Sequence, residues 1–232
     1  MSQNKSLATI DGEKLGKEPT LAINEIFYSI QGESTQAGRP TTFVRLMGCP
    51  LRCSYCDTEY AFFEGKKHSF TDLLGQIRAN PTNLVEITGG EPMAQPRVVP
   101  FMQLLVDEGF EVMIETSGAF TLADVPREVR IIMDVKTPGS KEVSKMHWDN
   151  FGYLKPGIDE VKFVICSKED FDFALEVAEA HNLFAKYAVL ISPSFGQVKN
   201  LDLANWVLES AKPWRMQLQM HKYVWHPEER GV

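Results

Sequence analysis

The sequence has few cysteines, no long apolar run and no excess of basic residues, and each shortage excludes a class of protein. Its four cysteines are too few for a disulfide-stabilised scaffold in a chain of 232 residues. No apolar run approaches the roughly 20 residues that a membrane-spanning helix needs. The 24 basic residues are outnumbered by 31 acidic ones, for a net charge of −7, whereas binding to a nucleic-acid backbone normally requires a basic patch. We therefore expect neither a membrane nor a nucleic acid as a partner.

The first 20 residues, MSQNKSLATIDGEKLGKEPT, are polar and lack the apolar core of a signal peptide. They predict a flexible N-terminal tail in front of one domain over residues 21–232, a length that single α/β barrels commonly reach. Free thiols without an export signal indicate a reducing compartment, so a cytoplasmic location is expected.

Three of the four cysteines, Cys49, Cys53 and Cys56, lie within eight residues of the run GCPLRCSYCDT. Thiolates are soft ligands that bind zinc, copper(I) and iron–sulfur clusters. A structural zinc site normally has four protein ligands, whereas a four-iron cluster held by three cysteines keeps one iron open to a small molecule. His68 or Cys166 could instead complete a zinc site, although Cys166, in the apolar run VKFVIC, is most simply a buried core cysteine.

Apolar runs rich in β-branched residues alternate along the chain with amphipathic helical patterns. The predicted strands are residues 41–47, 84–88, 111–116, 130–136, 160–165, 186–191 and 215–220, and the predicted helices are residues 70–79, 98–109, 169–182 and 201–211. Ser69 or Thr71 could cap the first helix, and Gly109 suits the left-handed position that ends the second. Strands that alternate with helices predict an α/β fold with a parallel sheet. The segment from about Asp134 to Asp159 has no helical period, so we expect an incomplete TIM-type barrel of parallel strands.

Polar or glycine-rich segments follow four of the predicted strands directly. The cysteine run follows the first strand, and TGGEP, ETSG and DVKTPGS follow the next three. Functional groups of parallel α/β sheets gather at the carboxyl ends of the strands, so these segments are expected on one rim. The paired glycines of TGGEP would let a ligand approach the backbone closely, although by itself TGGEP could equally be an ordinary turn.

The cysteine run resembles the CxxxCxxC signature of the radical S-adenosylmethionine (SAM) superfamily, and TGGEP resembles its GGEP motif. Together with INEIFYSIQGES, IETSG and QMHKY, the chain from about Ile23 to Tyr223 resembles the family of 7-carboxy-7-deazaguanine synthases. The resemblance implies a [4Fe–4S] cluster whose open iron is chelated by SAM and whose electron cleaves SAM to a 5′-deoxyadenosyl radical. It also implies a lyase that contracts the ring of 6-carboxy-5,6,7,8-tetrahydropterin to 7-carboxy-7-deazaguanine, with loss of ammonia, on the route to queuosine and related deazapurines.

The resemblance also assigns roles to individual residues. It implies that Cys49, Cys53 and Cys56 hold the cluster and that Thr58 binds Mg²⁺. The residues implied to bind SAM are Gly90, Glu91, Ser117, Asp134, Val135 and Lys136. The residues implied to bind the pterin are Ile30, Gln31, Gly32, Arg45 and Thr88. Glu115, at the end of a predicted strand, could relay a proton or, equally, bond to neighbouring backbone.

Several of these positions carry a chemical expectation or a departure from the family. The planar guanidinium of Arg45 suits a carboxylate. A lone Thr58 hydroxyl would need substrate oxygens and waters to complete a magnesium octahedron. Over residues 134–136 only the lysine matches the serine-proline-lysine stretch of many members. His221 and Lys222, expected at the end of the last strand, could line the pocket. The chain continues as VWHPEERGV, whereas many shorter members end on a proline whose carboxylate contacts the substrate.

Three other functions share part of this pattern. A glycyl-radical activating enzyme has the same cysteine spacing but a protein substrate, and a zinc-binding module would hold zinc without iron or sulfide. A tRNA-modifying radical enzyme would be expected to carry an added basic region. The family resemblance further implies an electron donor such as flavodoxin or ferredoxin, and a homodimer.

Overall fold

The computed structural model describes residues 18–232, so most of the tail expected over residues 1–20 lies outside the described residues. The described chain forms a nine-stranded sheet in the order β3-β1-β2-β4-β5-β6-β7-β8-β9. The strands are β1 (Thr20–Ile30), β2 (Pro40–Leu46), β3 (Lys66–Ser69), β4 (Leu84–Gly89), β5 (Glu111–Thr116), β6 (Arg130–Asp134), β7 (Glu160–Ile165), β8 (Ala188–Pro193) and β9 (Arg215–Met216). The α-helices are α1 (Phe70–Arg78), α2 (Val98–Asp107), α3 (Lys168–Ala180), α4 (Asn200–Ser210) and α5 (His221–Val224).

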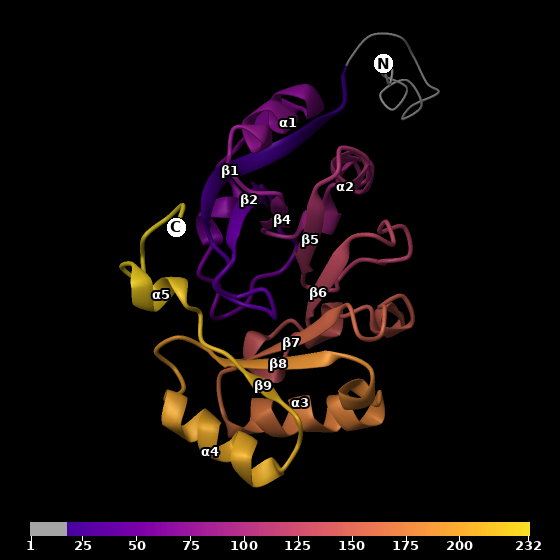
Figure 1. Cartoon of the computed structure of the whole chain (residues 1–232). Helices are drawn as coiled ribbons and strands as arrows, with labels where there is room; N and C mark the ends of the chain where they lie inside the picture. The colour runs from indigo at the N-terminus through magenta and orange to yellow at the C-terminus, as the bar shows by residue number, and fades with distance from the viewer. Residues whose placement is uncertain (1–17) are drawn as a thin grey trace.

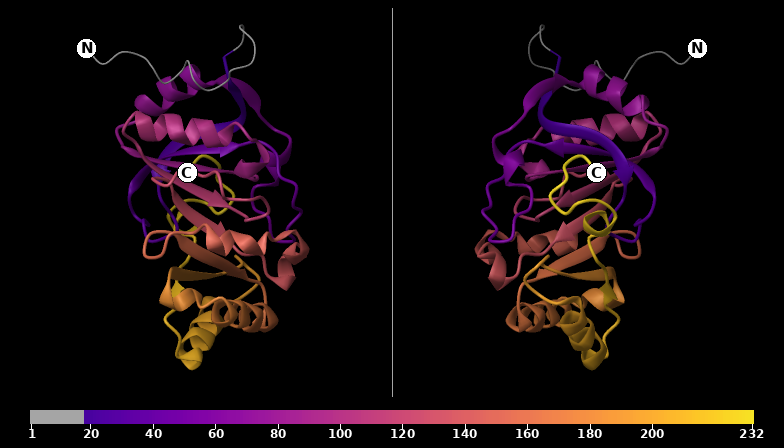
Figure 2. Two further views of the ribbon diagram at one scale, coloured as in Figure 1. Left: turned by 90° about the vertical axis from the view of Figure 1, so that its right-hand side faces the viewer. Right: turned by 90° about the vertical axis from the view of Figure 1, so that its left-hand side faces the viewer.

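The sheet is a partial barrel, as the sequence predicts. β1 pairs antiparallel with β2 and β3, and every pairing from β2 through β9 is parallel. The strands form an open arc in which β3 and β9 are the two edges, with α1 to α4 on the outer side (Figure 1). α5 and the C-terminal segment lie on the open side of the arc, in front of the strands in the right-hand view of Figure 2. Within residues 18–232, no helix has both the length and the apolar character needed to cross a membrane.

The predicted helices and central strands are confirmed, and the edges differ. Ser69 caps α1 by accepting a hydrogen bond from the Asp72 amide at 3.2 Å, and Gly109 follows α2 at φ +86°. Between β6 and β7 the chain forms three short 3₁₀ helices, Pro138–Ser140, Val143–Lys145 and Trp148–Gly152, instead of a crossover helix. β1 and β3 were not predicted, and β9 has two residues rather than six, although the Gln217 amide still donates to the Ile191 carbonyl of β8 at 2.9 Å.

The two faces of the sheet explain why the central strands are apolar except for one or two charged residues each. Alternate side chains point to opposite faces of a strand. On the outer face, side chains such as Ile87, Met133 and Phe163 join the main hydrophobic core under the helices. On the inner face, a small apolar layer is followed, toward the carboxyl ends, by charged side chains. The apolar layer is Leu84, Met113, Ile132 and Leu190, and the charged side chains are Glu86, Glu115, Asp134 and Lys162.

Candidate active site

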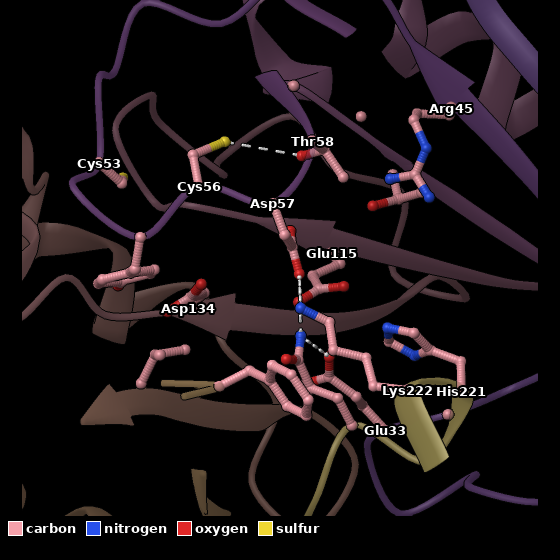
Figure 3. Close-up of a pocket in the computed structure, with 18 of the residues that line it drawn as sticks. Glu33, Arg45, Cys53, Cys56, Asp57, Thr58, Glu115, Asp134, His221 and Lys222 are labelled. Atoms are coloured by element: carbon pink, nitrogen blue, oxygen red, sulfur yellow. Dashed lines mark hydrogen bonds and ion pairs between the residues drawn. The ribbon is translucent and has the colours of Figure 1, made fainter. Parts of the chain in front are cut away.

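A cavity of about 510 Å³ lies at the carboxyl ends of the parallel strands (Figure 3). The loops that follow the strands deliver polar groups to this rim, as expected for a parallel sheet. The predicted site residues that line it are Ile30, Gln31, Gly32, Arg45, Cys49, Cys53, Cys56, Thr58, Thr88, Gly90, Glu115, Ser117, Asp134 and Lys136. Residues from both halves of the chain therefore meet in one cavity.

The TGGEP loop (residues 88–92) packs directly against the cysteine loop (residues 48–58). A Cβ atom on Gly90 would overlap the carbonyl oxygen of Gly48 and would lie 3.2 Å from the Cβ atom of Cys49. The next amide, that of Glu91, donates a hydrogen bond to the same Gly48 oxygen at 2.8 Å. Only glycine permits this backbone approach at position 90.

Glu91 and Val135 lie behind the cavity wall rather than in it. The buried Glu91 carboxylate accepts hydrogen bonds from the Met93 amide (2.9 Å), the Thr116 hydroxyl (2.8 Å) and both the amide and hydroxyl of Ser117 (2.7 and 2.6 Å). It therefore fixes the ETSG segment that contributes Ser117 to the cavity. The Val135 side chain belongs to the hydrophobic core, so a role for this residue in binding SAM is restricted to its backbone.

The three clustered cysteines are free, half-buried thiols facing the same cavity. Burial raises the pKa of Cys53 to about 11, and the nearby Asp134, Cys56 and Cys49 contribute in the same direction. Their loop is braced by Arg52, whose Nη1 donates to the Cys49 carbonyl at 2.8 Å and whose guanidinium lies 4.3 Å from the centre of the Phe62 ring. Thiolates are the ligand type that soft metal centres bind, but within residues 18–232 no three His, Cys, Asp or Glu side chains converge on the position of a single metal ion.

The two residues that could have completed a zinc site do not line this cavity. His68, on β3, bonds to Asp72 at 2.6 Å. Cys166 follows β7 directly and is half-buried rather than fully buried, because it lies just beyond the strand end. Its backbone amide donates to the Asp170 carboxylate at 2.9 Å. The structure thus gives the three-cysteine group no fourth ligand from either residue.

Next to the thiols, the cavity wall holds a buried ion pair with unused polar atoms. The Lys136 ammonium bonds to Oδ2 of Asp134 at 2.6 Å. Burial alone would lower the pKa of Lys136, but Asp134, Tyr55 and Cys53 together outweigh it, and the pKa lies well above its ordinary value. Among residues 18–232, Asp134 Oδ1 and the Tyr55 hydroxyl have no hydrogen-bond partner although both are buried. Buried polar atoms are normally paired, so these two can accept or donate to a polar ligand.

At another part of the cavity, Arg45 is held by Glu25. Arg45 Nε donates to Glu25 at 2.8 Å, and the Tyr60 hydroxyl donates to the same carboxylate oxygen at 3.0 Å. The Thr58 hydroxyl lies 3.8 Å from the Cys56 sulfur. Thr58 therefore lies beside the thiol group while Arg45 faces the cavity from β2 (Figure 3).

The cavity floor carries a network of polar and charged side chains in which Glu115 and Gln31 were predicted from the sequence, whereas Glu33, Glu86 and Lys162 were not. Lys162 forms ion pairs with Glu33 and with Glu115, the latter at 2.7 Å. Gln31 donates through Nε2 to Glu86, which is buried in β4. Burial raises the pKa of Glu115, against the opposing effect of Lys162. The available signal was a charged side chain in the interior of an otherwise apolar strand, such as Glu86 in β4 and Lys162 in β7.

α5 closes one side of the cavity, and its residues lie on a helix rather than at the end of a strand. A Cβ atom on Gly32 would lie 2.7 Å from Nδ1 and 3.3 Å from the backbone nitrogen of His221, so α5 packs closely against the Gly32 backbone. Lys222 forms an ion pair with Asp57 at 2.7 Å, and Gln219 donates to the same carboxylate at 3.3 Å. These contacts tie the end of the chain to the cysteine loop (Figure 3).

The C-terminal extension folds over the same cavity. Its lining residues are Pro227, Glu228, Glu229, Gly231 and Val232. Arg230 anchors this segment, with its guanidinium 3.8 Å from the centre of the Tyr60 ring and an ion pair to Glu64 at 3.1 Å.

The chain is similar to known proteins over most of its length. A sequence model of the radical SAM superfamily matches residues 44–182. A 7-carboxy-7-deazaguanine synthase from Koribacter versatilis is 45% identical over 227 residues, which cover 91% of this chain and all of the relative. A second, from Chlorobaculum tepidum, is 39% identical over 94% of this chain and all of the relative.

A solved structure supports the fold. The crystal structure of QueE from Escherichia coli superimposes with a TM-score of 0.72 at 23% identity, covering 87% of this chain and 95% of that one. The match extends to the partial barrel as a whole.

Proposed function

This chain belongs to the 7-carboxy-7-deazaguanine synthases of the radical SAM superfamily, and on that premise we propose how its cavity performs the reaction. The enzyme contracts the ring of 6-carboxy-5,6,7,8-tetrahydropterin to 7-carboxy-7-deazaguanine and releases ammonia. The observation that carries this assignment is one cavity that joins three free thiols to an arginine and a buried network of carboxylates.

The thiol end is suited to an iron–sulfur cluster and SAM. Cys49, Cys53 and Cys56 supply three thiolates, the ligand type that such clusters use. When bound, the cluster and SAM would supply one electron and an adenosyl radical that abstracts hydrogen from the substrate. Asp134 Oδ1 would accept a hydrogen bond from a cofactor hydroxyl, and Lys136 would offset the charge of that carboxylate.

The other end is suited to an acidic, nitrogen-rich ring. Arg45 would bind the substrate carboxylate through its guanidinium fork, in competition with Glu25. Ile30, Gln31, Gly32 and Thr88 would surround the ring. Glu115 would accept hydrogen bonds from ring N–H groups and would hold or return a proton during loss of ammonia, with Lys162 fixing its position. α5 and the C-terminal segment would exclude water from the ring.

Magnesium is part of this proposal. Mg²⁺ requires oxygen ligands in a nearly ideal octahedron and usually keeps several waters. Thr58 would contribute one hydroxyl oxygen beside the cluster ligands, and the substrate carboxylate and waters would provide the rest. The position of the Thr58 side chain between the thiols and Arg45 supports a metal ion that orients the substrate carboxylate (Figure 3).

Three further properties are proposed with it. An external one-electron carrier such as flavodoxin or ferredoxin would reduce the cluster, and the free thiols favour the reducing cytoplasm. A homodimer would cover large apolar side chains that are exposed on α4 and α5. These are Leu201, Leu208, Tyr223 and Val224. Light scattering of the purified protein at several concentrations would measure the oligomeric state.

The assignment is tested by turnover under anaerobic conditions. Protein reconstituted with iron and sulfide is incubated with the carboxypterin, SAM, Mg²⁺ and dithionite, and the product is identified by mass spectrometry. We expect 7-carboxy-7-deazaguanine and one equivalent of ammonia. Absence of product from protein with a full cluster would overturn the assignment. Zinc without iron or sulfide in anaerobically purified protein would support the zinc-binding module, and a glycyl radical formed on a partner protein would support an activating enzyme.

A further inference from the structure

Glu86 occupies an unusual position for a carboxyl group. It lies in the middle of β4, between Phe43 of β2 and Met113 of β5 in the sheet register. Only 2% of its surface is exposed, and what is exposed faces the cavity floor. An isolated buried carboxylate is costly, so the groups around Glu86 decide which form it takes.

The neighbour that contacts Glu86 directly is the amide of Gln31. Gln31 Nε2 donates a hydrogen bond to Glu86 Oε2, and Gln31 Oε1 accepts one from the Glu33 backbone amide at 3.0 Å. One contact needs the amide nitrogen as donor and the other needs the amide oxygen as acceptor. The Gln31 amide therefore cannot flip by 180° without losing both hydrogen bonds. Without Glu86 the amide nitrogen would lose its buried acceptor.

The charged groups that face Glu86 do not neutralise it. Glu33, from the loop after β1, and Glu115, from β5, are both acidic. Lys162, from β7, forms its ion pairs with those two carboxylates, and no ion pair joins Glu86 to a cation within residues 18–232. On the α5 side the titratable group is His221, whose pKa is lowered by burial. Burial first, and then Glu115 and Glu33, raise the pKa of Glu86 well above its ordinary value.

We propose that Glu86 is a positioning residue that acts in its uncharged form and holds the Gln31 amide in the orientation that the pterin ring requires. A charged Glu86 would be a third carboxylate on the cavity floor and would compete with Glu33 and Glu115 for Lys162. The uncharged acid keeps those two ion pairs intact while still accepting from Gln31. This inference rests on the proposed binding of a pterin at Gln31.

The first test compares Glu86→Gln with Glu86→Val. Glutamine is isosteric with an uncharged glutamic acid and can accept the Gln31 hydrogen bond, whereas valine fills the strand position without an acceptor. We expect Glu86→Gln to keep the KM for the pterin within about threefold and Glu86→Val to raise it about tenfold, the typical effect of one buried hydrogen bond. Equal losses in the two variants would show that the carboxyl acts as an anion and would overturn the inference.

The second test asks whether Glu86 acts through Gln31. In a double-mutant cycle, Glu86→Val is combined with Gln31→Ala, and pterin affinity is measured by calorimetry as well as by KM. We expect Glu86→Val to raise the KM by less than twofold when Gln31 has already been replaced by alanine. Fully additive effects would contradict positioning through Gln31. Iron content and thermal unfolding of each variant identify any variant that has lost its fold.

The pH dependence supplies a readout that a purely structural residue would not change. Ionisation of Glu86 in the wild type should raise the KM at alkaline pH, and Glu86→Gln should lack this rise. A rise of the same size in both proteins would assign the pH dependence to another group and overturn the inference.

If the wild type with a full cluster gives no product and binds no pterin, the proposed function itself fails. An active wild type with indistinguishable Gln and Val variants refutes only the role of Glu86.

Discussion

Gly90 lies against the backbone of Gly48 so closely that the TGGEP loop and the cysteine loop form one continuous wall of the cavity. The Glu91 amide bonds to the same Gly48 carbonyl at 2.8 Å, and a Cβ atom on Gly90 would overlap that carbonyl oxygen. Gly48 itself has φ +94°, a conformation that favours glycine. The two loops are therefore positioned by backbone contact, before any cofactor is considered.

Gly90→Ala should separate these loops and weaken SAM binding. Because the obstructing atom is backbone rather than a flexible side chain, the loops must move apart, and we expect SAM affinity to fall at least about tenfold. The measurement is equilibrium dialysis with labelled SAM on protein of known iron content.

Gly75→Ala is the matched control, since a Cβ atom at this position in α1 meets nothing within 4 Å. Alanine favours a helix by about 1 kcal/mol over glycine, so the control should bind SAM normally. Equal SAM affinity in the two variants would refute the role given to Gly90.

Cys53→Ala should abolish the iron–sulfur cluster, and Cys166→Ala should leave it intact. Cys53 faces the cavity with Cys49 and Cys56, whereas Cys166 lies outside the cavity lining, next to Asp170. Iron, sulfide and visible absorbance after anaerobic reconstitution measure the result. A cluster that survives Cys53→Ala, or one lost with Cys166→Ala, would show that the ligand set is wrong.

The residues that the sequence predicts best lie in short contiguous motifs, in which adjacent residues indicate the same site. The cysteine run and TGGEP each follow a predicted strand directly, and parallel strands bring their carboxyl ends together. Val135 shows the limit of this reasoning. It lies between two cavity residues, Asp134 and Lys136, and strand alternation turns it into the hydrophobic core. The period of two was present in the sequence and was sufficient to separate it from its neighbours.

The elements and contacts that could not be predicted depend on distant partners. β3 exists because Lys66–Ser69 pairs with the start of β1, and nothing local in its polar sequence indicates a strand. Glu86 and Lys162 looked like isolated charges in apolar strands. Their significance depends on Gln31, Glu33 and Glu115, which meet only when the barrel forms.

Lys162→Met should destabilise the protein and disturb the cavity floor. Methionine preserves the length of the side chain but leaves Glu33 and Glu115 without their shared cation. Removing one partner from a buried ion pair typically costs about 3–5 kcal/mol. Urea unfolding of the cluster-free protein at neutral pH measures the loss. Lys212→Met, which removes an exposed ion pair with Glu179, is the control and should change stability by less than about 1 kcal/mol. A similar loss in both would contradict the burial argument.

The stability of the protein should fall with rising pH in a way that depends on Glu86. The pKa of Glu86 is higher in the folded than in the unfolded protein, so its contribution to stability is complete below the ordinary carboxyl range and is lost as pH rises through the shifted pKa. Glu111, whose pKa is lowered by its hydrogen bond to Arg39, acts in the opposite direction and loses its contribution as pH falls. The difference between wild type and Glu86→Gln isolates Glu86. Urea unfolding from pH 6 to 9 should show the variant gaining relative to wild type, and parallel curves would refute the prediction.

Arg230→Ala should loosen the C-terminal segment over the cavity without affecting the cluster. Arg230 and Glu64 are exposed and the Tyr60 ring is half-buried, so each of the two anchoring contacts is modest. A surface cation–π contact contributes about 0.5–1 kcal/mol and a surface ion pair about 0–1 kcal/mol. Their combined loss of about 0.5–2 kcal/mol predicts a rise of about two- to thirtyfold in the KM for the pterin. Faster proteolysis of the C-terminal segment should accompany the rise in KM.

Arg127→Ala serves as the control, because Arg127 is exposed and lies outside the cavity lining. Because the ion pair between Arg230 and Glu64 is screened by salt, the wild-type KM should rise more at high ionic strength than that of Arg230→Ala. A salt response of equal size in both would assign the effect to the substrate charge instead of the segment.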